Sequence, residues 1–209
     1  MKIIRNLVLN ILVFIFMIEL IFASRNAHKT KEISSFLNDK FLVLGLKDIG
    51  FNDEIEEPFN TIRENAMQKS TTIFQYCNKN CFADDSGLFV SALNGLPGVK
   101  SARFAGRNCT SNDNVALLLN KMQGIENRTA YFETCIYLIY DAKPYIFNGI
   151  IHGKIALEHK GADGFGYDPV FIPEGYNQTF AEMPLSLKNE ISHRAIALKK
   201  MRLFLNSLT

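Results

Sequence analysis

Residues 81–87 (CFADDSG) constrain this chain more than any other stretch of its sequence. An apolar run ends there in two adjacent aspartates, which repel each other and are costly to place beside a core unless a cation compensates them. A hard divalent ion with oxygen ligands, above all Mg2+, is the natural partner of such a pair. For the segment alone, an Asp-Asp-Ser-Gly turn that satisfies its own backbone is favoured. The segment therefore predicts a turn at Asp84 and Asp85, and a metal site only if other segments support it.

The composition is that of an ordinary globular protein. The chain has 209 residues, of which 47% are hydrophobic and 21% charged, enough for one or two domains with a substantial core. Its formal net charge of +2 gives no reason to expect a nucleic-acid-binding surface, so any anion site must be local. The cysteines lack the paired spacing of metal ligands and predict free thiols in a reducing compartment: Cys77, Cys81, Cys109 and Cys135.

The N-terminal segment allows two interpretations. Lys2 and Arg5 precede the apolar stretch 7–16, and residues 21–23 (IFA) resemble a small-residue cleavage site. These are the parts of a secretory signal peptide. Charged residues such as Arg5 and Glu19 leave too short an apolar run for a membrane-spanning helix, so no stable membrane association is expected.

Residues 18–23 also fit the first strand of a fold, and cleavage after Ala23 would delete that strand. Met17 is placed where a compact domain would begin. We therefore favour residues 1–16 as an apolar extension or misassigned start, and residues 17–209 as the functional domain. This interpretation places the protein in the cytoplasm, with export as the alternative.

Strand and helix patterns alternate early, strands then dominate, and a helix closes the chain. Period-two and apolar runs predict strands at 18–22, 41–46, 130–140, 145–151 and 153–159, with a hairpin turn at 141–144. Helical spacing and caps predict helices at 29–37, after Thr61, at 112–122 and after Ser192. The helix after Thr61 should bury Ile62, Ala66, Ile73 and Phe74, and the last helix Ala195, Leu198, Leu205 and Leu208. The pattern indicates one α/β unit, a mixed central sheet flanked by helices, with two lobes around an active-site cleft.

Two segments before the aspartate pair carry further polar groups. Residues 24–29 (SRNAHK) fall at a strand-to-helix turn, where free N–H groups and a lysine can bind phosphate. A solvated polar turn is favoured for that segment alone, because the glycines of a phosphate loop are missing. Glu56 and Glu57 offer carboxylates to a metal, although an exposed acidic loop is the plainer explanation.

Two later segments concentrate aromatic and basic side chains. In residues 161–169 (GADGFGYDP), glycines permit close backbone approach and aromatics can stack on a planar base. Lys188 and residues 192–194 (SHR) supply several donors to one acceptor-rich ligand. An aromatic-anchored loop and a basic surface turn explain these segments about equally well.

With these segments in this order, the chain resembles the inosine triphosphate pyrophosphatase family over about residues 18–205. The most specific matches are 82–88 with 93–98, then 164–169, then 191–195. No single stretch identifies the family, whereas their joint occurrence does. The resemblance implies an Mg2+-dependent hydrolase that converts non-standard purine nucleoside triphosphates (ITP, dITP, XTP) to the monophosphate and pyrophosphate. Such an enzyme removes these compounds from the nucleotide pool.

The resemblance also implies roles for individual residues. Asp85 matches the general base and metal ligand, with Asp84 beside it as its catalytic neighbour. Glu57 is the best match for the second metal carboxylate, and Glu54 and Glu56 stay open. The implied phosphate-side contacts are Ser24, Arg25, Asn26, Ala27, His28, Lys29, Lys69 and Ser86. The implied nucleobase contacts are Phe165, Gly166, Tyr167, Asp168, Lys188, His193 and Arg194.

Two positions depart from the family pattern. Arg25 stands where the family usually has glycine, and a side chain there would disturb a turn that needs a positive φ. Lys100 replaces a common tyrosine. Two alternatives therefore stay open: a nucleotide pyrophosphatase of different base preference, and a nucleotide-binding sensor without turnover. In each case we expect a homodimer with a nucleotide ligand and no nucleic-acid partner.

Overall fold

The computed structural model of the protein describes residues 17–37 and 40–208, so the predicted extension 1–16 lies outside the described residues. The strands are β1 (Ile18–Phe22), β2 (Phe41–Gly45), β3 (Cys81–Val90), β4 (Pro97–Gly98), β5 (Thr129–Tyr140), β6 (Lys143–Ile155) and β7 (Phe171–Pro173). The α-helices are α2 (Ala27–Leu37), α3 (Ile62–Cys77), α4 (Ser111–Lys121), α5 (Leu185–Ile191) and α6 (His193–Ser207). Short 3-10 turns occupy Ser91–Leu93, Ser101–Arg103, Asp168–Val170 and Phe180–Glu182.

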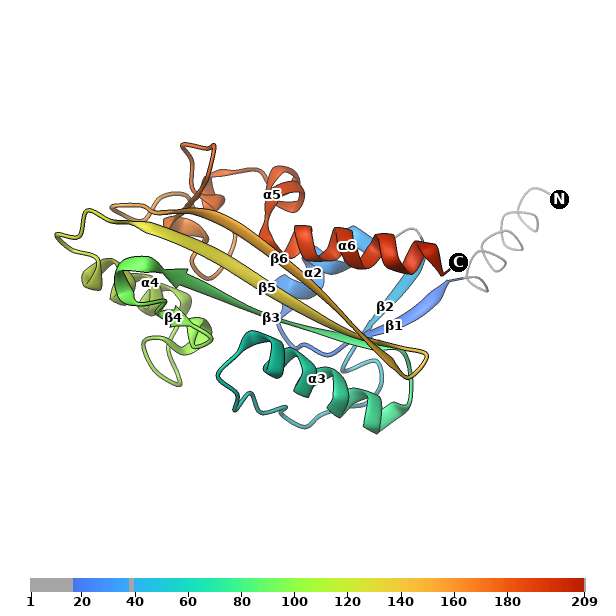
Figure 1. Ribbon diagram of the computed structural model, residues 1–209. Helices are drawn as coiled ribbons and strands as arrows, with labels where there is room; N and C mark the ends of the chain where they lie inside the picture. Colours follow the sequence, from blue (N-terminus) through green and yellow to red (C-terminus); the bar gives the residue numbers. More distant parts are fainter. Residues whose placement is uncertain (1–16, 38–39, 209) are drawn as a thin grey trace.

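The described strands form a mixed seven-stranded sheet in the order β2-β1-β3-β5-β6-β7, with β4 paired to β3. The pairs of β1 with β2 and β3 are parallel, and the remaining pairs are antiparallel. Helices α2 and α6 lie over one face of the sheet and α3 over the other (Figure 1). The predicted mixed sheet flanked by helices is confirmed. Within the described residues, no helix has both the length and the apolar character to cross a membrane.

Helix α2 begins two residues earlier than predicted because Asn26 caps it. The Asn26 side-chain oxygen accepts hydrogen bonds from the backbone N–H groups of His28 (3.0 Å) and Lys29 (3.2 Å). The helix then buries Ile33 and Leu37 against the sheet. The cap thus holds the β1–α2 turn (residues 24–29) at the end of β1.

Strand β3 runs without a break through both aspartates, so the predicted turn at Asp84 and Asp85 is wrong. Asp84 pairs with Ile136 and Asp85 with Cys135 of β5 in an antiparallel ladder. The hydrogen bonds of this long ladder outweigh the local turn preference of an Asp-Asp-Ser-Gly sequence. Because successive side chains of a strand point to opposite faces, the two carboxylates are separated by the sheet.

Strands β5 and β6 form the longest hairpin of the molecule. The turn consists of Asp141 and Ala142 alone, both with positive φ (48° and 58°), and is shorter than the predicted 141–144. Residues 153–155 belong to β6, so the separate strand predicted at 153–159 is wrong. Gly149 of β6 lets α6 approach closely, since a Cβ there would lie 2.0 Å from the His193 carbonyl oxygen.

The caps of α3 and α6 are confirmed. The Thr61 hydroxyl accepts from the Glu64 N–H, and the Ser192 hydroxyl accepts from the Ala195 N–H. The predicted inward residues are buried except Phe74, which is half-buried, and Leu208, which is 47% exposed because it follows the end of α6. Helix α5 was not predicted; it is only seven residues long.

Two groups of core contacts give the molecule its two lobes. One contains Leu118 of α4, Leu88 of β3 and Phe171 of β7. The other gathers α2, α6 and α3 around the parallel strands, with Phe22 and Phe82 stacked at 5.0 Å. Strands β3, β5 and β6 extend through both groups (Figure 1). The site described next is lined by residues from both lobes.

Candidate active site

A cavity of about 390 Å³ collects nearly all the residues that the sequence singled out. Those lining it are Ser24, Arg25, Asn26, Lys29, Glu57, Lys69, Asp85, Ser86, Phe165, Gly166, Tyr167, Asp168, Lys188, His193 and Arg194. Glu54 also lines the cavity, whereas Glu56 does not. Segments more than 100 residues apart in the chain therefore meet in one place, as the predicted cleft requires.

Three predicted residues do not line the cavity. Asp84 is completely buried behind it. Ala27 is the first residue of α2, and its side chain makes no part of the cavity wall. The exposed His28 stacks on Phe165, with ring centroids 5.1 Å apart and planes at 18°. Lys100, the second departure from the family pattern, is exposed and also lies away from the cavity.

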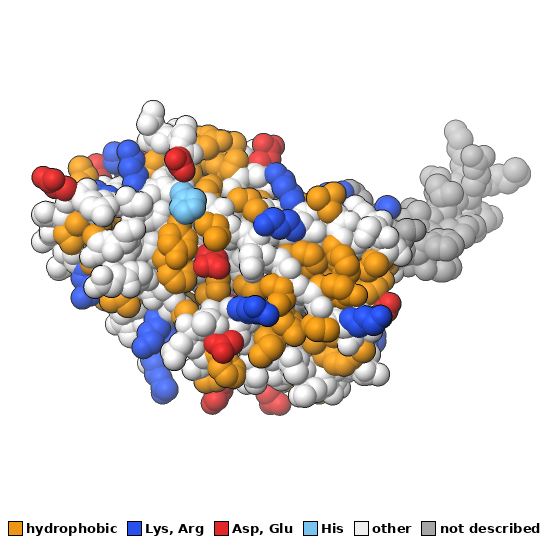
Figure 2. Space-filling view, in the orientation of Figure 1, with side chains coloured by type: hydrophobic (Ala, Val, Ile, Leu, Met, Phe, Trp, Pro, Cys, Tyr) orange, Lys and Arg blue, Asp and Glu red, His pale blue; other side chains and the backbone are white. Residues whose placement is uncertain are grey.

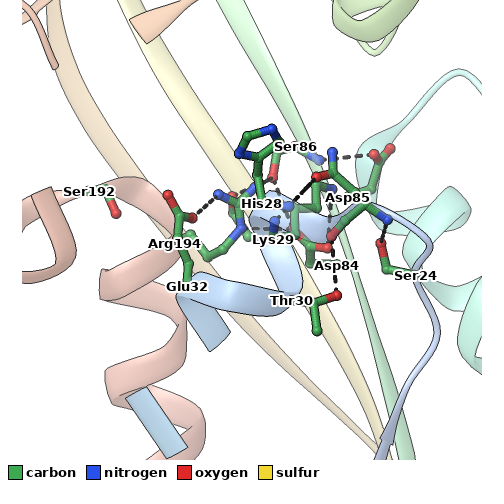
Figure 3. Close-up of polar contacts among 12 residues, drawn as sticks. Ser24, His28, Lys29, Thr30, Glu32, Asp84, Asp85, Ser86, Ser192 and Arg194 are labelled. Atoms are coloured by element: carbon green, nitrogen blue, oxygen red, sulfur yellow. Dashed lines mark hydrogen bonds and ion pairs between the residues drawn. The ribbon is translucent and has the colours of Figure 1, made fainter. Parts of the chain in front are cut away.

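Asp84 faces α2 and α6, and its charge is fully compensated there. Lys29 Nζ lies 3.1 Å from Oδ1, and Arg194 Nε lies 3.1 Å from Oδ2. Figure 3 shows Lys29 and Arg194 meeting at Asp84, with Glu32 paired to Arg194. Burial alone would raise the pKa of Asp84, but the two cations hold that pKa well below its ordinary value. Asp84 is therefore a permanent anion that holds two cavity-lining cations in place.

Asp85 faces α3 and opens onto the cavity. Lys69 Nζ lies 3.7 Å from Oδ1, and Asn65 Nδ2 donates to Oδ2 at 3.4 Å. Glu57 pairs with the same lysine, 2.5 Å from Nζ. Burial raises the pKa of Asp85 and outweighs the opposing effect of Lys69. Asp85 thus combines contact with the cavity and an increased affinity for a proton.

The β1–α2 turn presents side chains and N–H groups to the same part of the cavity. The Ser24 hydroxyl accepts from the Asn26 N–H at 3.2 Å. Arg25 does not have a positive φ, so its side chain is compatible with the turn. Its guanidinium donates to the carbonyl oxygens of Asn52 and Asp53. Lys29 follows in the first turn of α2, and burial lowers the pKa of its ammonium.

At the other end of the cavity, two cations share a buried carboxylate. Glu32 Oε1 lies 2.9 Å from Lys188 Nζ, and Glu32 Oε2 lies 2.7 Å from Arg194 Nη1. Lys188 also pairs with Asp168 Oδ2 at 2.6 Å. The Lys188 ammonium sits 4.6 Å from the centre of the Phe165 ring. This end is an aromatic surface with fixed hydrogen-bond donors beside it.

His193 completes that end as an uncharged group. Its ring stacks on Phe132 at 4.5 Å with an interplanar angle of 8°. Burial, together with Arg194 and Lys188, lowers its pKa well below the ordinary value, so the imidazole is neutral. Within the described structure, His193 Nδ1 is buried without a hydrogen-bond partner. A polar atom of this kind is a natural contact for a ligand that enters the cavity.

Sequence reasoning missed three residues that organise the site. Glu32 bridges Lys188 and Arg194, and its only signal was an acidic side chain one turn after Lys29 on a half-buried helix. Thr134 is buried on β5, with its hydroxyl 2.6 Å from that of Ser86. Arg103 holds Glu57 through both its carboxylate and its carbonyl oxygen. Neither Thr134 nor Arg103 stands in a segment whose composition suggests a site.

The fold and the site together define an α/β protein whose two lobes enclose a cavity with carboxylates and lysines at one end and an aromatic, donor-rich surface at the other. Residues 20–204 match the Ham1 family. The chain therefore belongs to the Ham1 family, and the resemblance drawn from the sequence is confirmed.

Individual relatives agree with this assignment. The chain is 45% identical to the dITP/XTP pyrophosphatase of Flavobacterium johnsoniae over 88% of this chain and 95% of that protein. It is 46% identical to the dITP/XTP pyrophosphatase of Porphyromonas gingivalis over 90% of this chain and 97% of that protein. The Ham1 protein structures from Staphylococcus aureus and Coxiella burnetii superpose with TM-scores of 0.83 and 0.85 at 36% and 35% identity, each covering 91% of this chain and 100% of the other.

Proposed function

We propose that the protein hydrolyses the non-standard purine nucleoside triphosphates ITP, dITP and XTP to the monophosphate and pyrophosphate, and so cleanses the nucleotide pool. The observation that carries this proposal is one cavity with a polyphosphate end at Lys29, Lys69 and Asp85 and a base end at Phe165 and Arg194. Relatives named dITP/XTP pyrophosphatase support it.

In this proposal Asp85 is the general base. A water oxygen forms a bond to the α-phosphorus, the bond from that phosphorus to the oxygen of the leaving pyrophosphate breaks, and the water proton passes to Asp85. The carboxylate is suited to this step because burial raises its pKa toward the range where a base can both ionise and accept a proton. Lys29 and Lys69 offset the charge of the polyphosphate.

The carboxylates of Asp85 and Glu57 fit a divalent cation. Both carboxylates approach the Lys69 ammonium, which marks a position where positive charge is stabilised. Among residues 17–37 and 40–208, no three metal-binding side chains of His, Cys, Asp or Glu come together. Mg2+ commonly binds through one or two carboxylates plus substrate phosphates and water, so this donor set suits it. Bound there, Mg2+ would neutralise charge on the phosphates.

The base end would select a 6-oxo purine. Lys188 and Arg194 can only donate hydrogen bonds, so they favour the 6-oxo oxygen of hypoxanthine or xanthine over the 6-amino group of adenine. Phe165 would stack on the base. His28 stacks on this ring and the Lys188 ammonium also lies over it, so a base that stacks on Phe165 would displace the imidazole.

A pyrophosphate-release panel on protein that begins at Met17 tests the proposed function. ITP, dITP and XTP should release pyrophosphate in the presence of Mg2+ far faster than ATP. Faster release from dUTP or methylated pyrimidine triphosphates would instead identify a pyrophosphatase of different base preference. Tight binding of ITP with no pyrophosphate released would identify a nucleotide sensor.

We also infer a cytoplasmic homodimer that binds no nucleic acid. Four free cysteines suit a reducing compartment. Leu96 and Ile150 are 48% and 43% exposed, close to the stacked pair Phe89 and Tyr131. Figure 2 shows hydrophobic side chains gathered over the β5–β6 hairpin in the orientation of Figure 1. Sedimentation of the protein that begins at Met17 would test the dimer, and a single species of about 21 kDa, the mass expected at roughly 110 Da a residue, would contradict it.

A further inference from the structure

The side chain of Arg25 leaves the β1–α2 turn and reaches the loop between β2 and α3. Its Nη2 group donates to the backbone carbonyl oxygens of Asn52 and, at 2.8 Å, Asp53. No other group in the described part of the chain donates to these two carbonyls. A planar, permanently charged guanidinium is well suited to hold two neighbouring carbonyl oxygens at once.

The residues held in this way begin a short acidic loop (residues 52–57) that forms one wall of the cavity. Before the loop, Phe51 is buried in the core, and after it the Phe59 N–H donates to the Asn65 side chain. Between these points, no backbone N–H of the acidic loop is hydrogen-bonded to a described residue. Its far end carries Glu57, which pairs with Lys69 beside Asp85. Glu57 is held there by Lys69 and Arg103, and the start of the loop is held by Arg25, so the polar contacts that place the loop lie at its two ends.

Repulsion within the acidic loop makes an anchor at its beginning important. Four carboxylates fall within six residues: Asp53, Glu54, Glu56 and Glu57. Like charges so close together favour an extended loop that moves away from the site. The positive charge of Arg25 opposes this tendency at the same place where its hydrogen bonds fix the backbone.

We propose that Arg25 is a positioning residue that fastens the acidic loop to the β1–α2 turn and so keeps Glu57 beside Asp85. Its effect on catalysis rests on the proposed function, whereas its effect on the loop does not. Arg25 acts through the loop, by its contacts with Asn52 and Asp53.

Limited proteolysis of the substrate-free protein tests the effect on the loop. A glutamyl endopeptidase cuts after Glu54 or Glu56, at a rate that follows how often the loop opens. Arg25→Ala should raise this rate about three- to tenfold, the effect of losing charge-assisted hydrogen bonds at an exposed site. Arg25→Lys keeps the positive charge but not the planar guanidinium, so its cleavage rate should lie between those of wild type and Arg25→Ala. Arg107→Ala, a matched change at an exposed arginine, should cut like wild type.

Steady-state kinetics of the same variants test the consequence for catalysis. Arg25→Ala should raise the Mg2+ concentration needed for half-maximal rate about three- to tenfold and change kcat less, because Glu57 is displaced while Asp85 is not. Cleavage of Arg25→Ala at the wild-type rate would overturn the proposal, and lost activity in that case would make Arg25 a direct substrate contact. If wild type releases no pyrophosphate from ITP, the proposed function fails, but the proteolysis still decides the role of Arg25.

Discussion

The two faces of β3 place neighbouring aspartates in opposite environments. On the face toward α2 and α6, Asp84 is closed off by Lys29 and Arg194, and its pKa is lowered. On the face toward α3, Asp85 meets Lys69 at a longer distance and opens onto the cavity, and its pKa is raised. Adjacent positions in the sequence thus receive different chemical properties from the two layers that cover the sheet.

In the proposed reaction, this difference separates a structural carboxylate from a reactive one. A general base must lose and accept a proton near its working pH, which a raised pKa permits and a strongly lowered one prevents. Asp84 instead keeps Lys29 and Arg194, two cations that line the cavity, in fixed positions. In the proposed reaction, proton transfer therefore falls to Asp85 and organisation of the site to Asp84, and substitutions on each face can test that division.

Asp85→Asn should produce the largest effect on catalysis. We expect the rate of pyrophosphate release from ITP to fall a hundredfold or more, roughly 3 kcal/mol in transition-state stabilisation, because the amide cannot accept the water proton. The fold should be retained, since the amide can still accept from the Ser86 N–H as the carboxylate does at 2.9 Å. Release at the wild-type rate would remove Asp85 from the reaction.

Asp84→Asn should instead act mainly on stability. Loss of this charge leaves Lys29 and Arg194 under-compensated in a buried setting, which should lower the free energy of unfolding by about 2–3 kcal/mol. Urea unfolding at pH 7 measures the change, with Asp85→Asn as the matched control on the other face. A larger loss of stability in the control would reverse the assignment of the two faces.

The pH dependence of this difference follows from the lowered pKa of Asp84. A carboxyl whose folded pKa is depressed stabilises the protein above its unfolded pKa, about 4. That contribution is lost as the pH falls through the folded pKa. The gap between wild type and Asp84→Asn should therefore be constant above about pH 5 and shrink below pH 4. A gap that widens on acidification would contradict the lowered pKa.

The sequence was sufficient to predict the overall fold but not the different environments on the two faces of β3. Apolar periodicity and caps such as Thr61 and Ser192 are local signals, and they predicted α3 and α6 correctly. The turn expected at Asp84 was wrong because the competing interaction, the β5 ladder, lies about 50 residues further along the chain.

The residues that organise the base end are equally non-local. Glu32 meets Lys188 and Arg194 across 156 and 162 residues of sequence. No spacing rule connects positions so far apart, so the cations could be singled out by composition while their shared carboxylate could not. The sequence likewise did not indicate that Arg25 contacts Asn52 and Asp53, because these residues lie 27 and 28 positions further along the chain.

Arg194→Ala should reduce discrimination between bases by a smaller factor. Removing a donor that we propose to face the 6-oxo oxygen should narrow the ratio of the ITP to the ATP hydrolysis rate about tenfold. Since the change also removes one of the two cations that pair with Glu32, the double variant Glu32→Gln with Arg194→Ala serves as a control with less uncompensated charge. An unchanged ratio in both variants would place discrimination elsewhere in the cavity.

Lys69→Met should cause the smallest and most specific change, a shift in pH dependence on the α3 face. Lys69 lowers the pKa of Asp85, so its removal lets burial raise that pKa further. Because Asp85 must be ionised to accept a proton, the acidic limb of kcat/KM should move to higher pH, whatever the loss in rate. Lys100→Met, at an exposed lysine away from the cavity, should leave the limb in place. If the acidic limb of kcat/KM stays fixed in both variants, it reports the titration of another group, such as the substrate phosphate. In that case the raised pKa of Asp85 would play no part in the pH dependence of catalysis.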